Sequence, residues 1–313
     1  MGERFVGEVK CGVFPGDATK FPPAVAKCLA QKSFRQLLGT MSPFMTTWTS
    51  ITARIRACAS PKGREQTGAI SLEGTRLFER ADRAGVRFEH VLVARSFGVG
   101  SEREARLLER LRSVAPVTEI PNEAMRELTG GRGIGAICGL AEHPRVPSLD
   151  DLLQGDAERR ATFLGLVDVE DPGNVGALAR TAHAAGARAL VTVGGVDAFH
   201  PKAIRTSMGS LFRLPVIRFD ALSAVVAAFT ARGIRSFGAT SSSGERVFDA
   251  DGLTESCCVF LGSEAFGLSA EAIRQLDGTI TIPMEDGVDS LSVNAAAAVC
   301  LFEVRRRRLA EPQ

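Results

Sequence analysis

The segment Asp168-Val-Glu-Asp-Pro-Gly-Asn-Val-Gly-Ala-Leu-Ala-Arg180 decides the fold of the C-terminal half of this chain. It begins where a hydrophobic strand, predicted over residues 163–169, gives way to an alanine-rich helix, predicted over 175–185. Asn174 and Arg180 therefore lie at a strand-to-helix connection. In open α/β sheets, ligands bind beyond the carboxyl ends of the strands, where such connections lie. We expect both side chains to belong to a functional site.

Strands and helices alternate throughout the region that contains this segment. Predicted strands cover residues 163–169, 189–193, 234–238, 257–262 and 279–283, and predicted helices cover 175–185, 201–211, 221–232, 270–276 and 291–307. The alternation predicts an α/β domain over residues 161–313, with a mostly parallel sheet and helices on both faces.

Two further segments lie at strand-to-helix connections of the same domain. They read Phe260-Leu-Gly-Ser-Glu-Ala-Phe-Gly-Leu268 and Ile282-Pro-Met, the latter followed by Ser290-Leu-Ser-Val-Asn-Ala295. Together and in this order, the three segments resemble the signature of the SpoU/TrmH family of RNA ribose 2′-O-methyltransferases. Residues 68–74 look like the small RNA-binding domain that often precedes the catalytic domain in this family, and residues 201–209 resemble the link between its first two motifs.

The resemblance implies a catalytic domain of the SPOUT class, in which the last segment threads a loop and forms a deep trefoil knot. Alternation alone could not predict this, because knots are nearly absent from proteins. We therefore divide the chain into a basic N-terminal extension (1–45), a small α/β RNA-binding domain (46–145), a linker (146–160) and a SPOUT methyltransferase domain (161–313).

The resemblance also implies a cofactor, S-adenosyl-L-methionine, which family members use as the methyl donor. Gly262, Ile282 and Leu291 match positions where family members contact it, and Ala239 is expected to line the same pocket. A glycine permits close backbone approach, and apolar side chains can enclose an adenine ring. For Ile282 and Leu291, plain core packing is the alternative.

The reacting ribose hydroxyl is a poor nucleophile, so it needs orientation and help in losing its proton. Arg180 matches the essential arginine of the family, and we expect it to bind the adjacent phosphate and stabilise alkoxide charge, because a guanidinium is not readily deprotonated. Asn174 is expected to fix local geometry, and Glu264 to orient Arg180 or Asn174. The alternatives are an Asx turn for Asn174 and a solvated ion pair between Arg180 and Glu264.

The third motif departs from the family pattern. Where the family commonly shows Ser-Leu-Asn-Val-Ser, this chain reads Ser290-Leu-Ser292-Val-Asn294. Ser290 is predicted to cap the terminal helix and to reach the active site as a catalytic residue. Residues two apart at the start of a helix do not share a face, so Asn294 is not expected simply to replace the missing asparagine.

The small N-terminal domain is predicted from shorter signals. Helices are expected over 47–59, 75–84 and 102–113, and strands over 69–73, 88–93 and 135–140. Lys62 and Arg64, on an expected loop over 60–64, are candidates for RNA contact. The stretch from Gly130 to Gly135 lacks a full G-x-G-x-x-G pattern and is predicted to be a turn, not a dinucleotide site.

Composition limits the classes of protein. The net charge of +2 over 313 residues excludes a global polycation, so RNA must meet a local basic surface. The seven cysteines form no Cys-x-x-Cys pair, and no histidine lies near them at zinc-ligand spacing, so we predict reduced thiols in a cytoplasmic protein without a metal. No apolar run approaches the roughly 20 residues that span a bilayer.

Two basic segments have open interpretations. No acidic residue occurs between Asp17 and Glu65, which is typical of an import signal, but Glu3, Glu8 and Asp17 lie at the very beginning, where such signals usually avoid acids. The alternatives are a disordered tail and a translation start at Met41 or Met45. The arginines at positions 305–308 could touch RNA phosphates or form a solvated helix end.

The resemblance thus implies a metal-independent RNA 2′-O-ribose methyltransferase that forms a homodimer, as family members usually do. It favours ribosomal RNA over transfer RNA, because a separate N-terminal domain is typical of the members that modify ribosomal RNA. One alternative is a catalytically silent RNA-binding protein of the same fold, for which Ser292 is the only support. A dinucleotide-dependent enzyme on an ordinary doubly wound sheet is a second alternative, opposed by the absence of G-x-G-x-x-G after any predicted strand.

Overall fold

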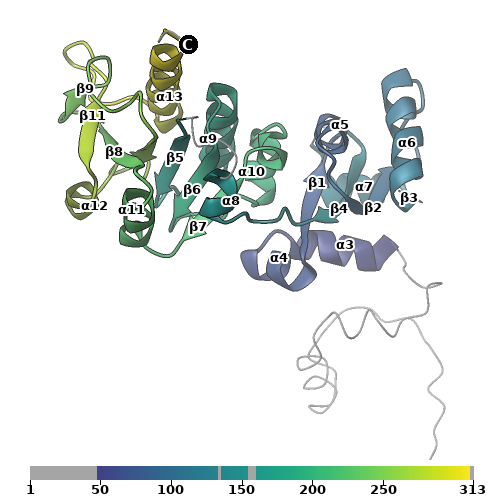
Figure 1. The fold of residues 1–313 in the computed structure, drawn as a ribbon. Helices are drawn as coiled ribbons and strands as arrows, with labels where there is room; N and C mark the ends of the chain where they lie inside the picture. The colour runs from purple at the N-terminus through teal and green to yellow at the C-terminus, as the bar shows by residue number, and fades with distance from the viewer. Residues whose placement is uncertain (1–47, 133–134, 154–159, 311–313) are drawn as a thin grey trace, which may run out of the picture. The chain divides into compact units, whose positions relative to one another are not determined.

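The computed structural model describes residues 48–132, 135–153 and 160–310. The predicted N-terminal extension over 1–45 lies outside these residues, as does the segment 154–159 of the predicted linker. The described residues carry two β-sheets, one in each half of the chain (Figure 1).

The N-terminal half forms a four-stranded sheet in the order β1-β4-β2-β3. Strand β4 pairs antiparallel with β1 and β2, and β3 pairs parallel with β2. The elements in chain order are α3 (Trp48–Ala57), α4 (Pro61–Thr67), β1 (Ala69–Glu73), α5 (Thr75–Arg83), β2 (Phe88–Ala94), α6 (Glu102–Val114), β3 (Val117–Ile120), α7 (Asn122–Thr129) and β4 (Ile137–Glu142).

The C-terminal half forms a seven-stranded sheet in the order β7-β6-β5-β10-β8-β11-β9, with every pairing parallel. Its strands are β5 (Thr162–Val167), β6 (Ala189–Val193), β7 (Val216–Phe219), β8 (Arg235–Thr240), β9 (Glu245–Arg246), β10 (Cys257–Leu261) and β11 (Gly278–Thr281). β5, β6 and β10 are buried along their whole length. Such strands are typical of parallel sheets that are covered on both faces, as the sequence predicted.

Helices cover both faces of this sheet (Figure 1). On one face, α9 (Pro172–Ala185), α10 (Pro201–Thr206) and α13 (Val293–Ala310) contribute to the cores. On the other face, α8 (Leu149–Leu153), α11 (Leu222–Thr230) and α12 (Ala270–Gln275) pack against the same strands. The last helix returns from β11 to pack against α9 and β5. The knot implied by the family resemblance stays a prediction.

Local signals fix the ends of the helices. The Asp171 side chain accepts a hydrogen bond from the backbone N–H of Asn174 at the start of α9, and Pro172 occupies the first turn. Gly186, with φ of 80°, ends this helix. A capping oxygen, an early proline and a left-handed glycine are the usual start and stop signals of a helix.

Several predicted boundaries were wrong. The predicted loop over 60–64 belongs to α4, because the Ser60 side chain caps a helix that begins at Pro61. The predicted helix over 201–211 is α10 followed by a separate 3₁₀ turn over Ser210–Phe212, since Met208 and Gly209 adopt positive φ angles between them. β3, β7, β9 and α7 were not predicted, because their short segments carry weak periodicity.

The two basic candidates of the small domain differ in their surroundings. Arg64 is 2% exposed; its Nη2 lies 2.5 Å from Asp197 Oδ2, and its Nη1 donates to the Cys58 carbonyl over 2.7 Å. The prediction that Arg64 contacts RNA was therefore wrong, because its guanidinium is enclosed by protein acceptors. Lys62 is exposed.

The arginines at the end of α13 bond to protein groups, although Arg305 and Arg306 are exposed, as predicted for a solvated helix end. Arg305, Arg307 and Arg308 donate to backbone carbonyls of neighbouring segments, and Arg306 pairs with Glu303. The guanidiniums of Arg305, Arg307 and Arg308 therefore connect the terminal helix to the rest of the domain, whereas the Arg306 pair lies within the helix. Within the described segments, no helix is both long and apolar enough to span a membrane.

Candidate functional site

The three sequence motifs meet at one edge of the seven-stranded sheet. β5, β10, β8 and β11 are neighbours in that order and run parallel, so their carboxyl ends lie side by side. The motifs continue directly from β5, β10 and β11. The strand order also reverses here, because β6 and β7 extend one way from β5 while β8 and β11 lie on the other side of β10. Ligands bind at such switch points in open α/β sheets.

Asn174 occupies the first turn of α9. Its backbone N–H is held by Asp171 Oδ1 at 3.0 Å, and Asp171 Oδ2 lies 2.9 Å from Lys202 Nζ. The Lys202 ammonium, followed by the N–H groups of Asn174 and Gly173, holds the pKa of the Asp171 carboxyl below its ordinary value. The start of α9 is thus fixed by a charged cap.

Glu264 accepts hydrogen bonds from the first motif. The Asn174 amide donates to Oε1 over 2.8 Å, the Asp171 N–H donates to Oε1 over 3.2 Å, and the Glu170 N–H donates to Oε2 over 3.3 Å. Burial acts to raise the pKa of this carboxyl, but these donors and its own N–H leave the pKa below its ordinary value. Of the two partners predicted for Glu264, the structure shows Asn174.

Asn294 completes a chain of hydrogen bonds that the sequence did not predict. Its Nδ2 donates to Asn174 Oδ1 over 3.0 Å, from the start of α13. Asn174 therefore joins Glu264 of the second motif to Asn294 of the third. The sequence did show an unexpected asparagine in the third motif. Helix spacing could not predict that the side chain of Asn294 points toward Asn174.

Arg180 lies one to two turns beyond Asn174 on α9 and is exposed. Among residues 48–132, 135–153 and 160–310, no hydrogen bond or ion pair to the Arg180 side chain is present. The predicted alternative of a solvated pair between Arg180 and Glu264 is therefore not what the structure shows. The exposed guanidinium is available to a ligand.

Ser290 does not cap the terminal helix, so that part of its prediction was wrong. Helix α13 begins at Val293, and Ser292 Oγ accepts a hydrogen bond from the Ala295 N–H over 3.3 Å. Ser292 is thus the capping residue. Ser290 lies in the exposed segment before it and forms no side-chain hydrogen bond with Asn174 or Glu264 among the described residues.

Three of the four predicted cofactor residues lie at the carboxyl ends of β8, β10 and β11, and the fourth, Leu291, lies in the segment before α13. Ala239 of β8 is paired with Ile280 in the neighbouring strand, and Ile282 directly follows β11. Both are half-buried, whereas Leu291 is 39% exposed. Small and apolar side chains on adjacent strands can hold the faces of a purine ring.

Gly262 has a steric reason to lack a side chain. A Cβ built on Gly262 would lie 2.0 Å from the carbonyl carbon of Gly267, since the following loop folds back over it. The Gly267 N–H donates to the Ser263 carbonyl over 2.8 Å and closes this loop. Gly262 is therefore required by its own loop, and a larger residue there would displace backbone at the carboxyl end of β10.

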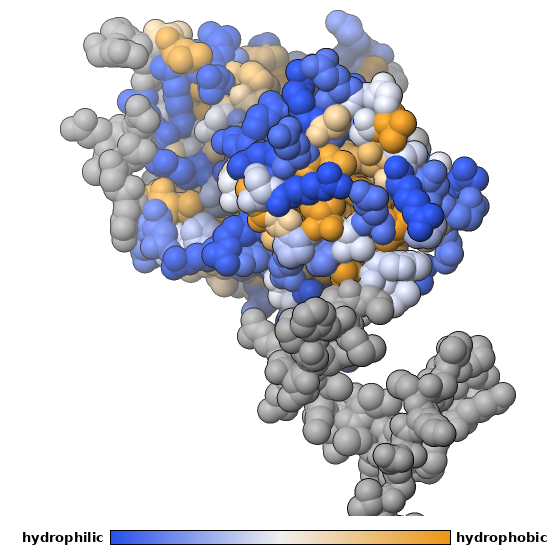
Figure 2. All heavy atoms as spheres, turned by 90° about the vertical axis from the view of Figure 1, so that its right-hand side faces the viewer, coloured by the Kyte–Doolittle hydropathy of each residue, from blue (hydrophilic) through white to orange (hydrophobic). Residues whose placement is uncertain are grey.

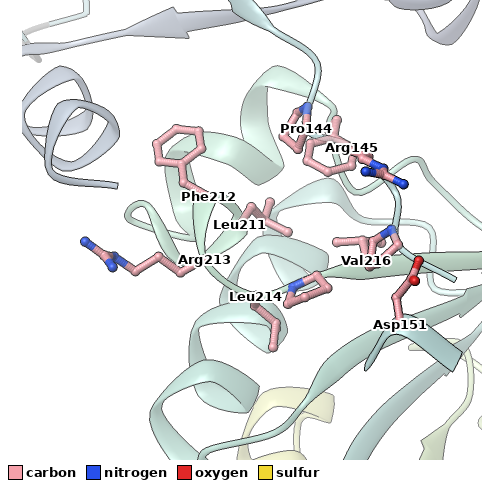
Figure 3. A pocket seen from close by; sticks show the side chains of 11 residues that line it. Pro144, Arg145, Asp151, Leu211, Phe212, Arg213, Leu214 and Val216 are labelled. Carbon is pink, nitrogen blue, oxygen red and sulfur yellow. The ribbon is translucent and has the colours of Figure 1, made fainter. Parts of the chain in front are cut away.

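A separate pocket of about 420 Å³ lies at the other end of the sheet (Figure 3). It is lined mostly by apolar groups, among them Phe212, Leu214 and Val216 at the amino end of β7. Because the strands run parallel, this end is opposite to the motifs. The pocket is not part of the candidate site.

Comparison with known proteins agrees with this geometry. Residues 161–302 match the model of the SpoU rRNA Methylase family. The chain is 29% identical to the 23S rRNA (guanosine(2553)-2′-O)-methyltransferase RlmP of Bacillus subtilis, over 78% of this chain and 91% of RlmP. It is 30% identical to an uncharacterized tRNA/rRNA methyltransferase of Mycobacterium avium, over 72% of this chain and 74% of that protein.

A solved structure shows the same fold. The SpoU methyltransferase AviRb from Streptomyces viridochromogenes, in complex with AdoMet, superposes with a TM-score of 0.73 at 26% identity, over 83% of this chain and 98% of AviRb. The fold and the joined motifs define an RNA methyltransferase. The chain belongs to the SpoU family.

Proposed function

We propose that this protein transfers a methyl group from S-adenosyl-L-methionine to a ribose 2′-hydroxyl of ribosomal RNA. The observation that carries the proposal is the chain of hydrogen bonds from Asn294 through Asn174 to Glu264, together with the exposed Arg180 on the same helix as Asn174. The relatives named for 23S rRNA 2′-O-methylation support ribosomal RNA as the substrate class.

S-adenosyl-L-methionine, when bound, supplies an electrophilic methyl group. Ala239, Gly262, Ile282 and Leu291 would hold it, at the ends of adjacent strands and at the segment before α13. Asn174 then orients the reacting ribose, because its amide is fixed on one side by Glu264 and on the other by Asn294.

Arg180 is proposed to bind the phosphate next to the target ribose and to stabilise the developing alkoxide. It is exposed and has no protein partner among the described residues, so binding a phosphate breaks no ion pair. A guanidinium can grip phosphate oxygens with two hydrogen bonds. Ser290, exposed before α13, is proposed to contact the substrate from the third motif.

Residues 46–145 are proposed to be the RNA-binding domain, joined through 146–160 to the methyltransferase domain at 161–313. Figure 2 looks onto the side of the molecule where α6 lies and shows mostly hydrophilic residues there. The α6 arginines are paired with acids, as in Arg103–Glu79 and Arg110–Asp82. We therefore assign RNA contact to exposed basic residues outside α6, such as Lys62 and Arg95.

A homodimer in the cytoplasm is proposed as the working form. The terminal helix exposes Phe302 and Leu309, which are 46% and 73% exposed, next to its packing with α9. These two apolar side chains, exposed on one helix, support contact with a partner chain there. The five described cysteines are free and buried, which supports a reducing compartment.

The test is incubation of the purified protein with methyl-labelled S-adenosyl-L-methionine and with ribosomal or transfer RNA separately. Label that survives alkaline hydrolysis as a dinucleotide establishes ribose methylation, and the labelled fraction names the substrate class. Arg180→Ala serves as the inactive control. Label only in transfer RNA would contradict the ribosomal substrate, and no label despite cofactor binding would contradict methyl transfer.

A further inference from the structure

The amide of Asn174 has a single consistent orientation. Glu264 is ionised at neutral pH and can only accept hydrogen bonds, so the group that Asn174 presents to it must be Nδ2. Asn174 Oδ1 therefore points to the other neighbour, Asn294, which must present its own Nδ2 as donor. The Glu264 carboxylate thus fixes the orientation of the Asn174 amide, and the Asn174 amide in turn fixes that of Asn294.

These two hydrogen bonds leave the Asn174 amide able to form further hydrogen bonds. A side-chain amide has two N–H donors and an oxygen with two lone pairs. One donor is used by Glu264 and one lone pair by Asn294, so one donor and one lone pair stay available in a fixed plane. A ribose hydroxyl needs such an acceptor to direct its proton away from the incoming methyl group.

Asn294 carries a buried polar atom without a hydrogen-bond partner among the described residues. Its Oδ1 is buried and accepts no hydrogen bond from any residue that the structure describes. Buried polar atoms are rarely left without a partner, and the exceptions call for a specific role. The neighbouring Ser292 supplies the helix cap, so capping does not account for Asn294.

We infer that Asn294 is a positioning residue of the methyl-transfer site, orienting Asn174 from α13 in this chain, where the family pattern has its asparagine at position 292. The inference rests on the proposed function. Asn294 is not proposed to touch the reacting atoms. It acts by holding the amide of Asn174 in place.

Asn294→Ala removes the donor to Asn174. We expect kcat for RNA methylation to fall about 10- to 100-fold, because small misplacements of an orienting group have effects of that size. The Kd for S-adenosyl-L-methionine, measured by calorimetry, should change less than about twofold, and so should KM for RNA. Ser148→Ala, which removes the hydrogen bond from the Asp151 N–H at the start of α8, is the control for loss of a polar contact at a helix start.

Asn294→Asp separates positioning from packing. It is nearly isosteric, but its carboxyl can donate to Asn174 Oδ1 only when protonated. The ratio of its kcat to that of the wild type should therefore rise as the pH falls from about 8 to about 5.5, whereas the ratio for Asn294→Ala should stay flat.

Two results would overturn the inference: Asn294→Ala with kcat within about twofold of wild type, or parallel pH profiles for the alanine and aspartate variants. The wild-type reaction, run in the same experiment, distinguishes failure of the proposed function from failure of the inference about Asn294. Absence of label with wild-type protein contradicts the proposed function, whereas equal label with wild type and Asn294→Ala contradicts only the role of Asn294.

Discussion

Asn174 Nδ2 lies 2.8 Å from Glu264 Oε1, which joins the loop after β10 to the first turn of α9. The same carboxylate also accepts the N–H groups of Glu170 and Asp171, the two residues just before the helix. One side chain therefore fixes both the backbone that enters α9 and the amide that faces the candidate site.

Glu264→Gln should lower kcat for RNA methylation by about 10- to 100-fold, because one carbonyl oxygen replaces two and its NH₂ group faces N–H donors. Single-turnover methyl transfer measures the effect. Glu271→Gln, which changes an exposed glutamate of α12, is the control. A rate equal to wild type would show that the carboxylate is not needed to orient Asn174.

Arg180→Ala should lower kcat/KM for RNA by about 100-fold or more while the melting temperature stays unchanged, because Arg180 has no protein partner in the described part of the chain. Methylation assays and thermal unfolding of the same sample measure both. Arg274→Ala removes an exposed arginine of α12 as a control. A large fall in melting temperature would instead indicate a structural role.

Gly262→Ala should weaken binding of S-adenosyl-L-methionine about tenfold or more, because the loop that contacts Gly262 must move to accept a methyl group. Isothermal calorimetry measures the Kd. At Gly278 in β11, the nearest atoms to a built Cβ are 3.5 Å away, so Gly278→Ala is the matched control. Equal affinity for both variants would refute the steric argument.

Arg64→Ala should lower the free energy of unfolding by about 3–5 kcal/mol, because it leaves the Asp197 carboxylate without its buried partner. Denaturant unfolding gives the value. Lys62→Ala, two residues away and exposed, should change it by less than about 0.5 kcal/mol. If Lys62→Ala lowered the free energy of unfolding more than Arg64→Ala did, the Arg64–Asp197 pair would contribute no stability.

Glu303→Gln should destabilise the protein at neutral pH by about 2–3 kcal/mol. Hydrogen bonds from Arg306, together with those from Arg307, outweigh burial and lower the pKa of Glu303 to about 2. A carboxyl with a lowered folded pKa contributes stability above its unfolded value of about 4.3, and this contribution is lost as the pH falls toward 2.

The unfolding free energies of wild type and Glu303→Gln should therefore converge below about pH 4. Glu109→Gln, at an exposed position of α6, should show no such pH-dependent difference. A constant gap between wild type and Glu303→Gln across this range would exclude the ion pairs as its cause.

The sequence alone predicted the parallel α/β domain and its family. Alternating hydrophobic strands and amphipathic helices are local patterns, and the three motifs are short runs at strand ends. It also placed Asn174, Gly262 and Glu264 at those ends. It missed short elements such as α4 and β7, because a few residues carry too little periodicity to be distinguished from loops.

Only the tertiary structure decided which side chains pair. Glu264 bonds Asn174 and not Arg180, Asn294 reaches Asn174 while Ser292 caps α13, and Arg64 is buried against Asp197. A hydrogen bond depends on distance and direction to within a few tenths of an ångström between segments far apart in the chain. Spacing along one helix or strand fixes a face of that element, whereas the packing of the sheet and helices fixes what that face meets.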